Sequence, residues 1–401
     1  MVYGMNSIVV APTFLRSSCA VGQIERHFFP NLPGGYFSHI FCAKDDLDLK
    51  GSNFQTHIIP ENKLSVTADL LFRKAGWKDL VYSPDITHYS WCGRAHKEIA
   101  SLLKKEKIDY IHTVNNPVSA HLLGYKVKNE FGLPWVAQFY DPWHNNPFRR
   151  YSCRYFDRKD AERERLVAEN ADLILFPNEE LLDSWVQIYG DTVKNKVEVL
   201  PFVTELPAIK EKKRDSDTLT ISHIGTLSKE RRADVFLKAI SKLNKCNPDL
   251  AARLNVNIVG FVTDSDKECI ARENIGGIVD VKGHLSEEEC FKYYEDSDVF
   301  LIIDIDCEPN LFYPSKLIKY FCSRKPILGI TKSNSVVANE LQKSGNHVCA
   351  YDDVEGIYSF LVRAISDYES INHNDKEYGN RFSPGNVVAG FERLINKYIH
   401  D

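Results

Sequence analysis

The chain has 401 residues, which exceeds the roughly 250–300 residues that a single hydrophobic core usually organises, so we expect two domains. Hydrophobic residues make up 43% and charged residues 26%, a balance that excludes a disordered chain, a collagen and a coiled coil. The formal net charge of −5 excludes a global basic field for nucleic acid, so an anionic partner must bind to a local patch.

The longest apolar runs, Ser7–Leu15 and Val299–Ile303, have the length of strands and fall far below the roughly 20 residues of a membrane span. No basic residue precedes the first run, so the N-terminus is not expected to be a signal peptide. None of the ten cysteines forms a Cys-x-x-Cys pair. We therefore expect reduced, mostly buried thiols in a cytoplasmic protein, with neither a zinc site nor a disulfide framework.

The first half of the chain alternates between β-branched or apolar runs and helical patterns. Expected strands are Ser7–Ala11, Ile108–Thr113, Pro134–Tyr140, Ala171–Phe176 and Val197–Phe202. Expected helices run from about Val118 to Phe131 and from Arg158 to Asn170, and Ser17–Gly35 is expected to be a long loop. Strands that alternate with helices favour a parallel sheet covered on both faces.

A polar segment without apolar periodicity, Ala208–Asp217, is typical of a linker, and the alternation restarts after it. Expected strands are Leu219–Ile224, Val256–Phe261, Ile278–Lys282, Asp298–Asp304 and Pro326–Ile330. Expected helices are Val235–Leu243, one that a capping box at Ser286 begins and that ends near Asp296, Leu317–Cys322, and Asn386–Ile399. The pattern predicts two doubly wound α/β domains, in which ligands bind beyond the carboxyl ends of the strands.

The first candidate site is the segment Ser222–Asp234, where a strand ends at Gly225 and a helix begins near Ala233. A glycine lets backbone amides approach a ligand, and Lys229, Arg231 and Arg232 supply countercharge for a diphosphate. The alternative interpretation is a solvated charged loop. The absence of Gly-x-Gly-x-x-Gly gives little support to a dinucleotide site.

The second candidate lies at the start of the helix after the acidic loop that Asp304 begins. Lys316, Lys319 and Tyr320 are spaced by three and four residues and share one helix face. Two lysines beside a helix N-terminus suit a phosphate, and the alternative is a surface helix with ordinary lysines.

The third candidate, Gln138–Asn146, places polar and aromatic groups at a strand end, where a sugar can stack and hydrogen-bond. Asp141 and His144 form an acid–base pair there, and the alternative is a turn whose Trp143 packs into the core. The fourth candidate is the expected loop Ser17–Gly35, in which Gly22 would face an acceptor or a phosphate. The alternative is an ordinary long loop without a ligand.

A local basic patch, 147–165, carries seven basic and four acidic residues with interleaved aromatic side chains. Its net charge of +3 favours contact with an anionic membrane surface near a lipid-linked acceptor, and the alternative is a solvated helix with Glu–Arg pairs.

These segments, in this order, resemble a GT-B glycosyltransferase, and more narrowly the family 4 type that acts on bacterial surface glycans. The resemblance covers about Ile8 to Tyr398 and is carried by seven segments: His223-Ile-Gly-Thr-Leu227, Val281-Lys-Gly-His-Leu285, Tyr294–Ile303, Tyr313-Pro-Ser-Lys-Leu-Ile-Lys-Tyr320, Lys325-Pro-Ile-Leu328, Asn116-Pro117 and Asp141-Pro-Trp143. Each motif is loose, whereas the ordered set is fairly specific.

The resemblance implies two Rossmann-like domains that face each other across a cleft. Residues 1–205 would bind the acceptor, residues 206–383 would bind the nucleotide-sugar, and 384–401 would form a helix that crosses back to the first domain. It implies a hexosyl transfer with retention at the anomeric carbon, no metal and no cofactor, in capsule or lipopolysaccharide synthesis. The protein would be cytoplasmic, with peripheral contact at the inner face of the membrane.

Carried onto this chain, the resemblance implies donor or diphosphate contacts at Gly225, Thr226, Lys229, Arg231, Ser315, Lys316 and Lys319. It implies acceptor or sugar contacts at Gly22, Asn116, Asp141 and Trp143, and catalytic roles for Asp141, His144, Arg231 and Lys316.

Two positions depart from the family pattern. Many relatives have Arg where this chain has Thr226, and Glu where it has Lys319. Two alternatives therefore stay open: a non-catalytic subunit that binds a nucleotide or a partner enzyme, and a sugar-nucleotide 2-epimerase of the same fold.

Overall fold

The computed structural model describes residues 4–43, 46–82, 86–205, 217–371 and 374–400. The predicted linker Ala208–Asp217 lies outside the described residues except for Asp217. The chain divides into two compact units, one formed by Met1–Glu205 with Arg381–Asp401 and the other by Leu206–Asn380.

Unit 1 contains a seven-stranded sheet in the order β3-β2-β1-β4-β5-β6-β7, and every pairing in it is parallel. The strands are β1 (Asn6–Val10), β2 (Phe37–Ala43), β3 (Phe54–Ile59), β4 (Tyr110–Val114), β5 (Trp135–Gln138), β6 (Leu173–Phe176) and β7 (Val197–Val199). The strand order changes direction between β1 and β4. The carboxyl ends of these two strands therefore form the switch point at which such sheets bind ligands.

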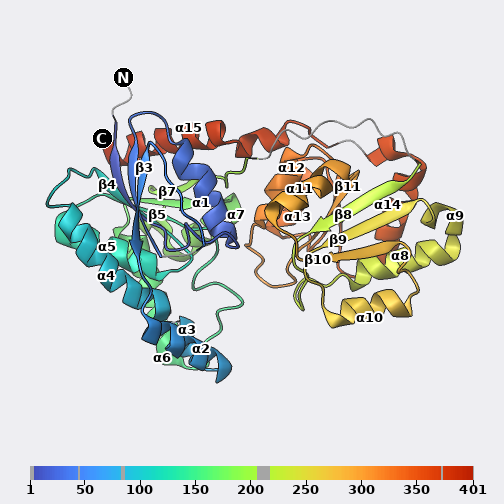
Figure 1. The fold of residues 1–401 in the computed structure, drawn as a ribbon, viewed down its shortest axis with the longest axis horizontal. Coiled ribbons are helices and arrows are strands. Elements are labelled where there is room, and N and C mark those ends of the chain that lie inside the picture. Colours follow the sequence, from blue (N-terminus) through green and yellow to red (C-terminus); the bar gives the residue numbers. More distant parts are fainter. Residues whose placement is uncertain (1–3, 44–45, 83–85, 206–216, 372–373, 401) are drawn as a thin grey trace. The chain divides into compact units, whose positions relative to one another are not determined.

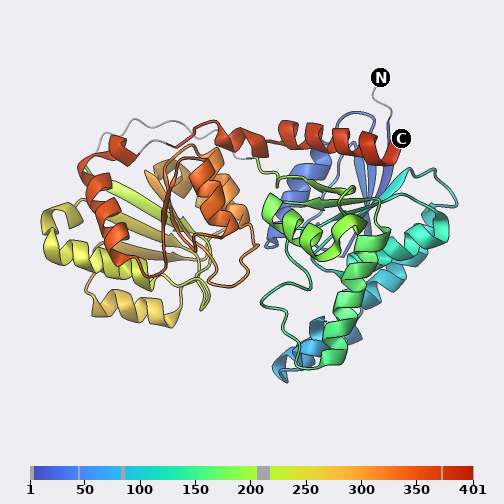
Figure 2. The same ribbon diagram turned by 180° about the vertical axis from the view of Figure 1, so that it is seen from behind.

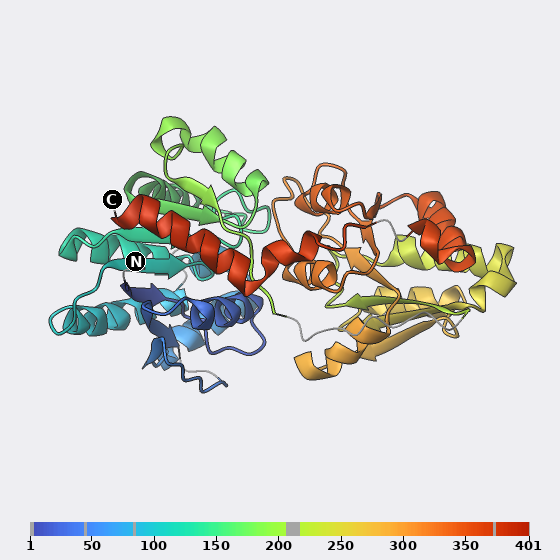
Figure 3. The same ribbon diagram turned by 90° about the horizontal axis from the view of Figure 1, so that it is seen from above.

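The helices of unit 1 are α1 (Ala20–Phe28), α2 (Lys63–Lys74), α3 (Lys78–Tyr82), α4 (Ile86–Leu102), α5 (Ser119–Phe131), α6 (Arg154–Asn170), α7 (Glu179–Tyr189) and α15 (Pro384–Ile395). From α15, Phe391 packs edge-to-face on Phe28 of α1 and stacks on His112 of β4, so α1 and α15 cover one face of the sheet (Figure 3). His121 of α5 and Trp185 of α7 both pack on Phe139, on the opposite face (Figures 1 and 2).

Unit 2 contains a six-stranded parallel sheet in the order β10-β9-β8-β11-β12-β13. Its strands are β8 (Leu219–Ile224), β9 (Leu254–Val259), β10 (Val279–Gly283), β11 (Val299–Ile303), β12 (Ile327–Ile330) and β13 (His347–Cys349). Its helices are α8 (Asp234–Cys246), α9 (Pro248–Ala251), α10 (Asp264–Arg272), α11 (Glu287–Asp296), α12 (Ser315–Cys322), α13 (Val336–Lys343) and α14 (Val354–Ser366).

The core of unit 2 forms where α8 and α14 pack on one face of the sheet. Phe236 and Ile240 of α8 and Phe360 of α14 belong to one buried apolar cluster with strand residues such as Leu301. On the other face, the ring of Tyr320 of α12 stacks on the ring of Phe300 of β11, with 4.4 Å between the ring centroids. All five residues of β11 are buried, as the continuous apolar run predicts for a central parallel strand.

The prediction of two doubly wound α/β domains is confirmed by the two sheets. The capping box at Ser286 is also confirmed, since its side chain accepts a hydrogen bond from the Glu289 amide and the Glu289 carboxylate reaches the Ser286 amide. The prediction of a loop over Ser17–Gly35 is wrong, because α1 and the short 3-10 helix Phe29–Asn31 together occupy most of that segment. The last turn of α1 contains Arg26 and His27, and basic residues there favour a helix C-terminus.

Candidate functional site

Two glycines meet at the carboxyl ends of β8 and β9, and neither position accepts a side chain. Gly225 has φ +142° and Gly260 has φ +137°, in the region that favours glycine. The Gly225 amide donates to the Val259 carbonyl at 2.7 Å. A Cβ at Gly260 would lie 2.4 Å from the Gly225 carbonyl oxygen. The backbone of Gly225 and Thr226 is therefore held close against β9 while Thr226 stays exposed.

Lys316, near the start of α12, brings its ammonium directly over Gly225. A Cβ at Gly225 would lie 2.5 Å from the Lys316 Nζ. The same nitrogen lies 3.3 Å from Nε2 of the buried His223. His223 Nδ1 lies 3.0 Å from the Leu301 carbonyl oxygen, so Nδ1 carries the proton and Nε2 accepts from Lys316.

Lys316 has one positive and one negative neighbour, Arg231 and Asp304, beside the neutral His223. Burial and, to a smaller extent, the charge of Arg231 lower the pKa of Lys316 to about 7, while the charge of Asp304 acts in the opposite direction. Burial also lowers the pKa of His223 well below its usual range, so His223 is neutral at pH 7. An anion placed here would favour the charged form of Lys316.

Arg231 contributes the second cation of this cluster. The chain forms a tight bridge between Ser228 and Arg231, whose backbone groups hydrogen-bond to one another at 3.1 and 3.3 Å. Arg231 Nε is buried and has no hydrogen-bond partner among the described residues. A buried guanidinium donor without an acceptor costs free energy that a bound anion would recover. Lys229 and Arg232, by contrast, are exposed.

Asp304 lies at the end of β11 and is fully buried. Its carboxylate accepts hydrogen bonds from Asn310 at 2.7 Å and from Thr331 at 2.8 Å. Burial raises its pKa, and the charge of Arg231 partly offsets that effect. His223, Asp304, Arg231 and Lys316 thus form one cluster of interacting groups, in which Lys316 lies against Gly225.

The remaining predicted donor residues are placed differently. Ser315 is the first residue of α12 and is partly exposed. Lys319 forms an ion pair with Glu287 of α11 at 2.5 Å, and its side chain is 15% exposed. Because Glu287 matches its charge, Lys319 contributes less free charge to a diphosphate than Lys316 or Arg231.

In unit 1, the loops after β4 and β5 are joined by hydrogen bonds around Asp141. Asn116 Nδ2 donates to the Asp141 carboxylate at 2.9 Å, and Asn115 Nδ2 donates to the Asp141 carbonyl at 3.1 Å. The Tyr140 amide in turn donates to Asn115 Oδ1 at 2.7 Å. The structure therefore brings together Asn116 and Asp141, two of the predicted acceptor residues.

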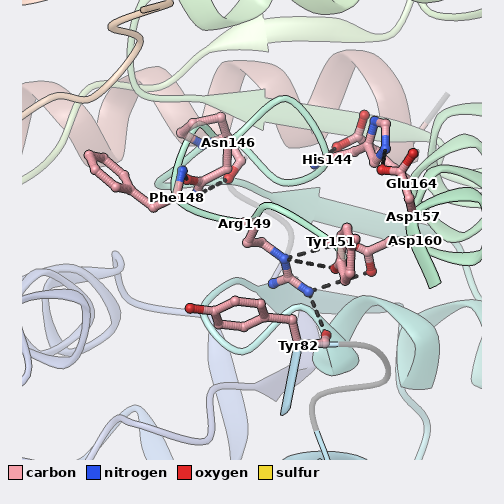
Figure 4. Close-up of polar contacts among 10 residues, drawn as sticks. Tyr82, His144, Asn146, Phe148, Arg149, Tyr151, Asp157, Asp160 and Glu164 are labelled. Carbon is pink, nitrogen blue, oxygen red and sulfur yellow. Dashed lines mark hydrogen bonds and ion pairs between the residues drawn. The ribbon is translucent and has the colours of Figure 1, made fainter. Parts of the chain in front are cut away.

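The structure gives His144 and Trp143 partners other than a ligand. His144 Nε2 lies 2.9 Å from Asp157 of α6, and the His144 amide donates to the Glu164 carboxylate at 2.6 Å (Figure 4). Trp143 is fully buried beside His121 and Phe139, as the alternative interpretation expects, so its face is not available to a sugar. The acid–base partner of His144 here is thus Asp157, and the carboxylate of Asp141 is bonded to Asn116.

The basic patch 147–165 is only partly a surface feature. Arg149 is 12% exposed and lies 3.4 Å from the buried Asp160, and it donates to the Tyr82 carbonyl at 2.6 Å (Figure 4). Arg158 and Lys159 both pair with Glu162, in the way that the alternative of a helix with ion pairs expects. Arg150, Arg154 and the aromatic Phe148 and Tyr155 are exposed.

Gly22 lies in the first turn of α1, where close packing excludes a side chain. A Cβ there would lie 2.4 Å from the Thr13 carbonyl oxygen. Arg26 of the same helix donates to the Phe14 carbonyl at 2.6 Å and the Arg16 carbonyl at 3.1 Å. Gly22 thus lets α1 approach the loop after β1, and no ligand role follows from this contact.

The sequence analysis gave no role to three residues that the structure singles out. His223 and Asp304 received no role, although each ends or follows an apolar strand, where site residues gather. Glu25 of α1 was also missed: it is fully buried, and neither carboxylate oxygen has a hydrogen-bond partner among the described residues. Burial raises the pKa of Glu25 well above its usual range.

Across the residues that the structure describes, no group of three or more His, Cys, Asp or Glu side chains is arranged to hold a metal ion. A search of the same residues for a helix both long and apolar enough to cross a bilayer finds none.

The chain matches no protein-family model and no curated protein sequence. Solved structures do resemble it. Sucrose-phosphate synthase from Thermosynechococcus elongatus superposes with a TM-score of 0.69 at 11% identity, over 98% of each chain. HepE from Anabaena, solved with UDP and glucose, superposes with a TM-score of 0.65 at 12% identity, over 98% of this chain and 100% of that one.

The lipopolysaccharide outer core galactosyltransferase WaaB gives a TM-score of 0.63 at 13% identity, over 98% of this chain and 99% of that one. These likenesses extend over the whole chain and concern its architecture. The chain has the GT-B fold. The fold class expected from the resemblance is thereby confirmed, whereas the roles expected for the two domains and for the site residues remain predictions.

Proposed function

We propose that this protein is a retaining, metal-independent glycosyltransferase that moves a hexosyl group from a nucleotide-diphosphate sugar to a glycan or lipid-linked acceptor in surface polysaccharide synthesis. The observation that carries the proposal is the pair of half-buried cations Arg231 and Lys316 beside Gly225, with a buried Arg231 Nε that has no hydrogen-bond partner among the described residues. Neighbours of the same fold include an Anabaena protein solved with UDP-glucose and a lipopolysaccharide galactosyltransferase.

In this proposal the donor diphosphate binds to the cluster in unit 2. Backbone amides of the Gly225 loop, the Arg231 guanidinium and the Lys316 ammonium would contact its oxygens. When the bond between the anomeric carbon and the diphosphate oxygen breaks, these groups stabilise the negative charge that the leaving nucleoside diphosphate gains. His223 is a positioning residue, because it acts through its hydrogen bond to Lys316.

The acceptor hydroxyl forms the new bond to the anomeric carbon on the face that the diphosphate leaves, and its proton passes to the departing phosphate oxygen. No metal or further cofactor enters this scheme. Asp141, held by Asn116, would orient the sugar or the acceptor. Peripheral contact with the inner face of the membrane would bring a lipid-linked acceptor within reach.

The experiment that tests the proposal is calorimetry with UDP, GDP, ADP, CDP and dTDP, first without metal and then with Mg²⁺. We expect selective, metal-independent binding of one diphosphate, and a loss of about tenfold or more in Arg231→Ala and Lys316→Ala. Arg232→Ala is the matched control, because Arg232 is an exposed neighbour whose removal leaves the cluster intact.

Unchanged affinity in both cluster variants would refute the site. Binding without any sugar transfer to an acceptor extract would favour the non-catalytic subunit. Conversion of the sugar-nucleotide without an acceptor would favour the 2-epimerase. In the transfer assay, Asp141→Asn should lower turnover while donor affinity stays near the wild-type value.

A further inference from the structure

Helix α6 of unit 1 carries three carboxylates on one face. Asp157, Asp160 and Glu164 are spaced by three and four residues, so their side chains lie on one side of the helix. Asp160 is 1% exposed and Glu164 is 2% exposed. A buried carboxylate costs free energy unless hydrogen bonds satisfy it, so its partners show what it holds. All three side chains contact the segment between β5 and α6, residues 139–153, which we call the β5 loop.

Glu164 and Asp157 together fix His144 of the β5 loop. One carboxylate oxygen of Glu164 accepts from the His144 amide at 2.6 Å, and the other accepts from the Tyr189 hydroxyl at 2.7 Å. The His144 ring lies 2.9 Å from the Asp157 carboxylate (Figure 4). Burial raises the pKa of Glu164, and the hydrogen bond from the His144 amide acts in the opposite direction. His144 is thus held at its backbone and at its ring, three residues after Asp141.

Asp160 holds the β5 loop at a second point. Arg149 Nε lies 3.4 Å from the Asp160 carboxylate, and the Tyr151 hydroxyl donates to the same carboxylate. Arg149 also donates to the Tyr82 carbonyl at 2.6 Å. Figure 4 shows the Arg149 guanidinium between the Tyr82 carbonyl and the side chains of Asp160 and Tyr151. The middle of the loop is therefore anchored to α6 as firmly as its beginning.

Asn146 connects the two anchored parts of the loop. Its Nδ2 donates to the Pro142 carbonyl at 3.2 Å, and its Oδ1 accepts from the Phe148 amide at 2.9 Å. Pro142 directly follows Asp141, whose own carbonyl accepts from Asn115 at 3.1 Å. The turn that begins with Asp141 is thus held from β4 on one side and from α6 on the other.

These contacts give a different meaning to the segment that the sequence presents as a basic patch. Residues 147–165 have a net charge of +3, yet two acids of this segment, Asp160 and Glu164, are buried and face the β5 loop. Glu162, on another side of the same helix, pairs with Arg158 and Lys159 and is half exposed. The acids on the buried side of α6 are therefore distinguished from the solvated ones by the loop that they contact.

We propose that Asp157, Asp160 and Glu164, here called the α6 clamp, are positioning residues that hold Asp141 in place for glycosyl transfer. Glu164 is the principal member, because it is buried and contacts the backbone of the turn. The inference rests on the proposed function, in which Asp141 orients the sugar or the acceptor. A reacting group that is displaced by about 1 Å loses much of its rate advantage, so the clamp would affect turnover and leave donor binding in unit 2 unchanged.

The first test is a substitution of Glu164 in the whole protein. Glu164→Leu replaces the carboxylate by an apolar side chain of similar size, and we expect turnover to fall about tenfold with a lipid-linked saccharide extract as acceptor. The KM for the donor and the nucleoside diphosphate affinity in calorimetry should change by less than about twofold. Glu164→Gln should restore most of the turnover, because its amide oxygen can still accept from the His144 amide. Glu162→Gln is the matched control on the same helix, outside the α6 clamp.

A double-mutant cycle distinguishes positioning from general stabilisation. If Glu164 acts through Asp141, Glu164→Leu should lower turnover by less than about twofold in the Asp141→Asn background. A residue that merely stabilises unit 1 would lower turnover by the same factor in both backgrounds. Independent, multiplying losses would therefore overturn the proposal.

Hydrogen exchange reports on the clamp without an acceptor. The peptide that contains the His144 amide should exchange about tenfold faster in Glu164→Leu than in the wild type, and at the wild-type rate in Glu162→Gln. Asn146→Ala is a second variant, chosen because Asn146 lies in the loop and outside the core. It should speed exchange in the same peptide and lower turnover about threefold, even if Glu164→Leu does not fold.

Three further results would overturn the proposal. They are wild-type exchange of the β5 loop in both variants, faster exchange with unchanged turnover, and a loss of donor affinity as large as the loss of turnover. Absence of transfer by the wild type would refute the proposed function and remove the positioning role with it. Hydrogen exchange still measures the hold of α6 on the loop in that case, so the two failures are distinguishable.

Discussion

Lys316 is a half-buried lysine whose pKa lies well below its usual range. Its pKa of about 7 results first from burial and then from the nearby Arg231, and the neutral His223 accepts its hydrogen bond without supplying a negative charge. A structural lysine is normally paired with a carboxylate, as Lys319 is with Glu287. A phosphate ligand would complete this arrangement of a cation beside a guanidinium whose Nε has no hydrogen-bond partner among the described residues.

The pKa of Lys316 predicts a pH dependence of nucleotide binding. Above about pH 7 the free protein must take up a proton for Lys316 to meet a diphosphate in its charged form. Affinity is therefore expected to fall by up to about tenfold per pH unit between about pH 7 and pH 9. Calorimetry across this range checks the slope. Lys316→Met should flatten it and Lys319→Met should preserve it, and a steep slope in Lys316→Met would contradict the assignment.

Glu25 predicts a pH-dependent stability of unit 1. Its pKa is raised by burial, so above the ordinary pKa of a glutamate the unfolded state releases a proton that the folded state retains, and stability declines as pH rises. Glu25→Gln should therefore gain stability over the wild type as the pH goes from about 5 to about 8, by at most about 1.4 kcal/mol per pH unit.

Urea unfolding at several pH values measures this difference. The control is Glu98→Gln, since Glu98 is exposed in the same unit and its substitution should give no such trend. Parallel pH profiles for wild type and Glu25→Gln would show that Glu25 ionises normally in the folded protein.

At the scale of elements, the candidate donor site depends on how strands end. β8 and β9 are each followed by a glycine with positive φ, Gly225 and Gly260. Because these glycines carry no side chain, their loops approach each other closely and Lys316 of α12 can lie against Gly225. The site is thus produced by the packing of two loops and one helix N-terminus, not by any one motif. The Asp79 carboxylate has a similar joining role in unit 1, where it fixes α3 to the start of α6.

The glycine pair predicts that Gly260→Ala is destabilising. A Cβ at this position would lie 2.4 Å from a backbone oxygen of Gly225, which cannot move as a flexible side chain can, and φ would be strained as well. We expect a loss of about 1–3 kcal/mol in the free energy of unfolding, with weaker nucleotide binding. Gly276→Ala is the control, because nothing lies within 4 Å of the added Cβ. Wild-type stability of Gly260→Ala would show that the two loops separate readily.

At the scale of the whole molecule, each unit has its own sheet and core, and the chain's C-terminal segment completes the first unit. Phe391, nearly at the end of the sequence, lies 5.0 Å from Phe28 and 5.5 Å from His112 between ring centroids. The proposed donor groups all lie in unit 2, whereas Asn116 and Asp141 lie in unit 1. In the proposed function, the donor and the acceptor would therefore bind to different units.

The assignment predicts where a bound nucleotide diphosphate slows amide exchange. We expect protection in the segments 222–233 and 313–320 of unit 2, because a ligand that binds only the native state stabilises the structure around it. Hydrogen exchange with mass spectrometry checks this with the intact chain. The Lys316→Ala variant should lose the protection, and protection confined to unit 1 would contradict the proposed donor site.

The sequence alone predicts the strands and helices whose pattern is local. Three predictions of this kind are correct: the apolar strand β11, the capping box at Ser286, and the succession of β8 and α8. Burial on both faces and backbone capping each require a residue pattern only a few positions long. Two α/β domains follow from that alternation. The glycine of the Gly225 loop and the neighbouring cations were also identified from spacing.

Other features were decided only by the tertiary structure. They include the helix α1 where a loop was expected, the burial of Trp143, the pairing of His144 with Asp157, and the ion pair of Lys319 with Glu287. Each depends on neighbouring groups whose position cannot be read from the sequence. His223 and Asp304 acquire a role only when β8, β11 and α12 bring them to Lys316. A residue's charge and hydrogen bonds depend on what lies within a few ångströms of it, and in a doubly wound sheet those neighbours come from distant parts of the chain.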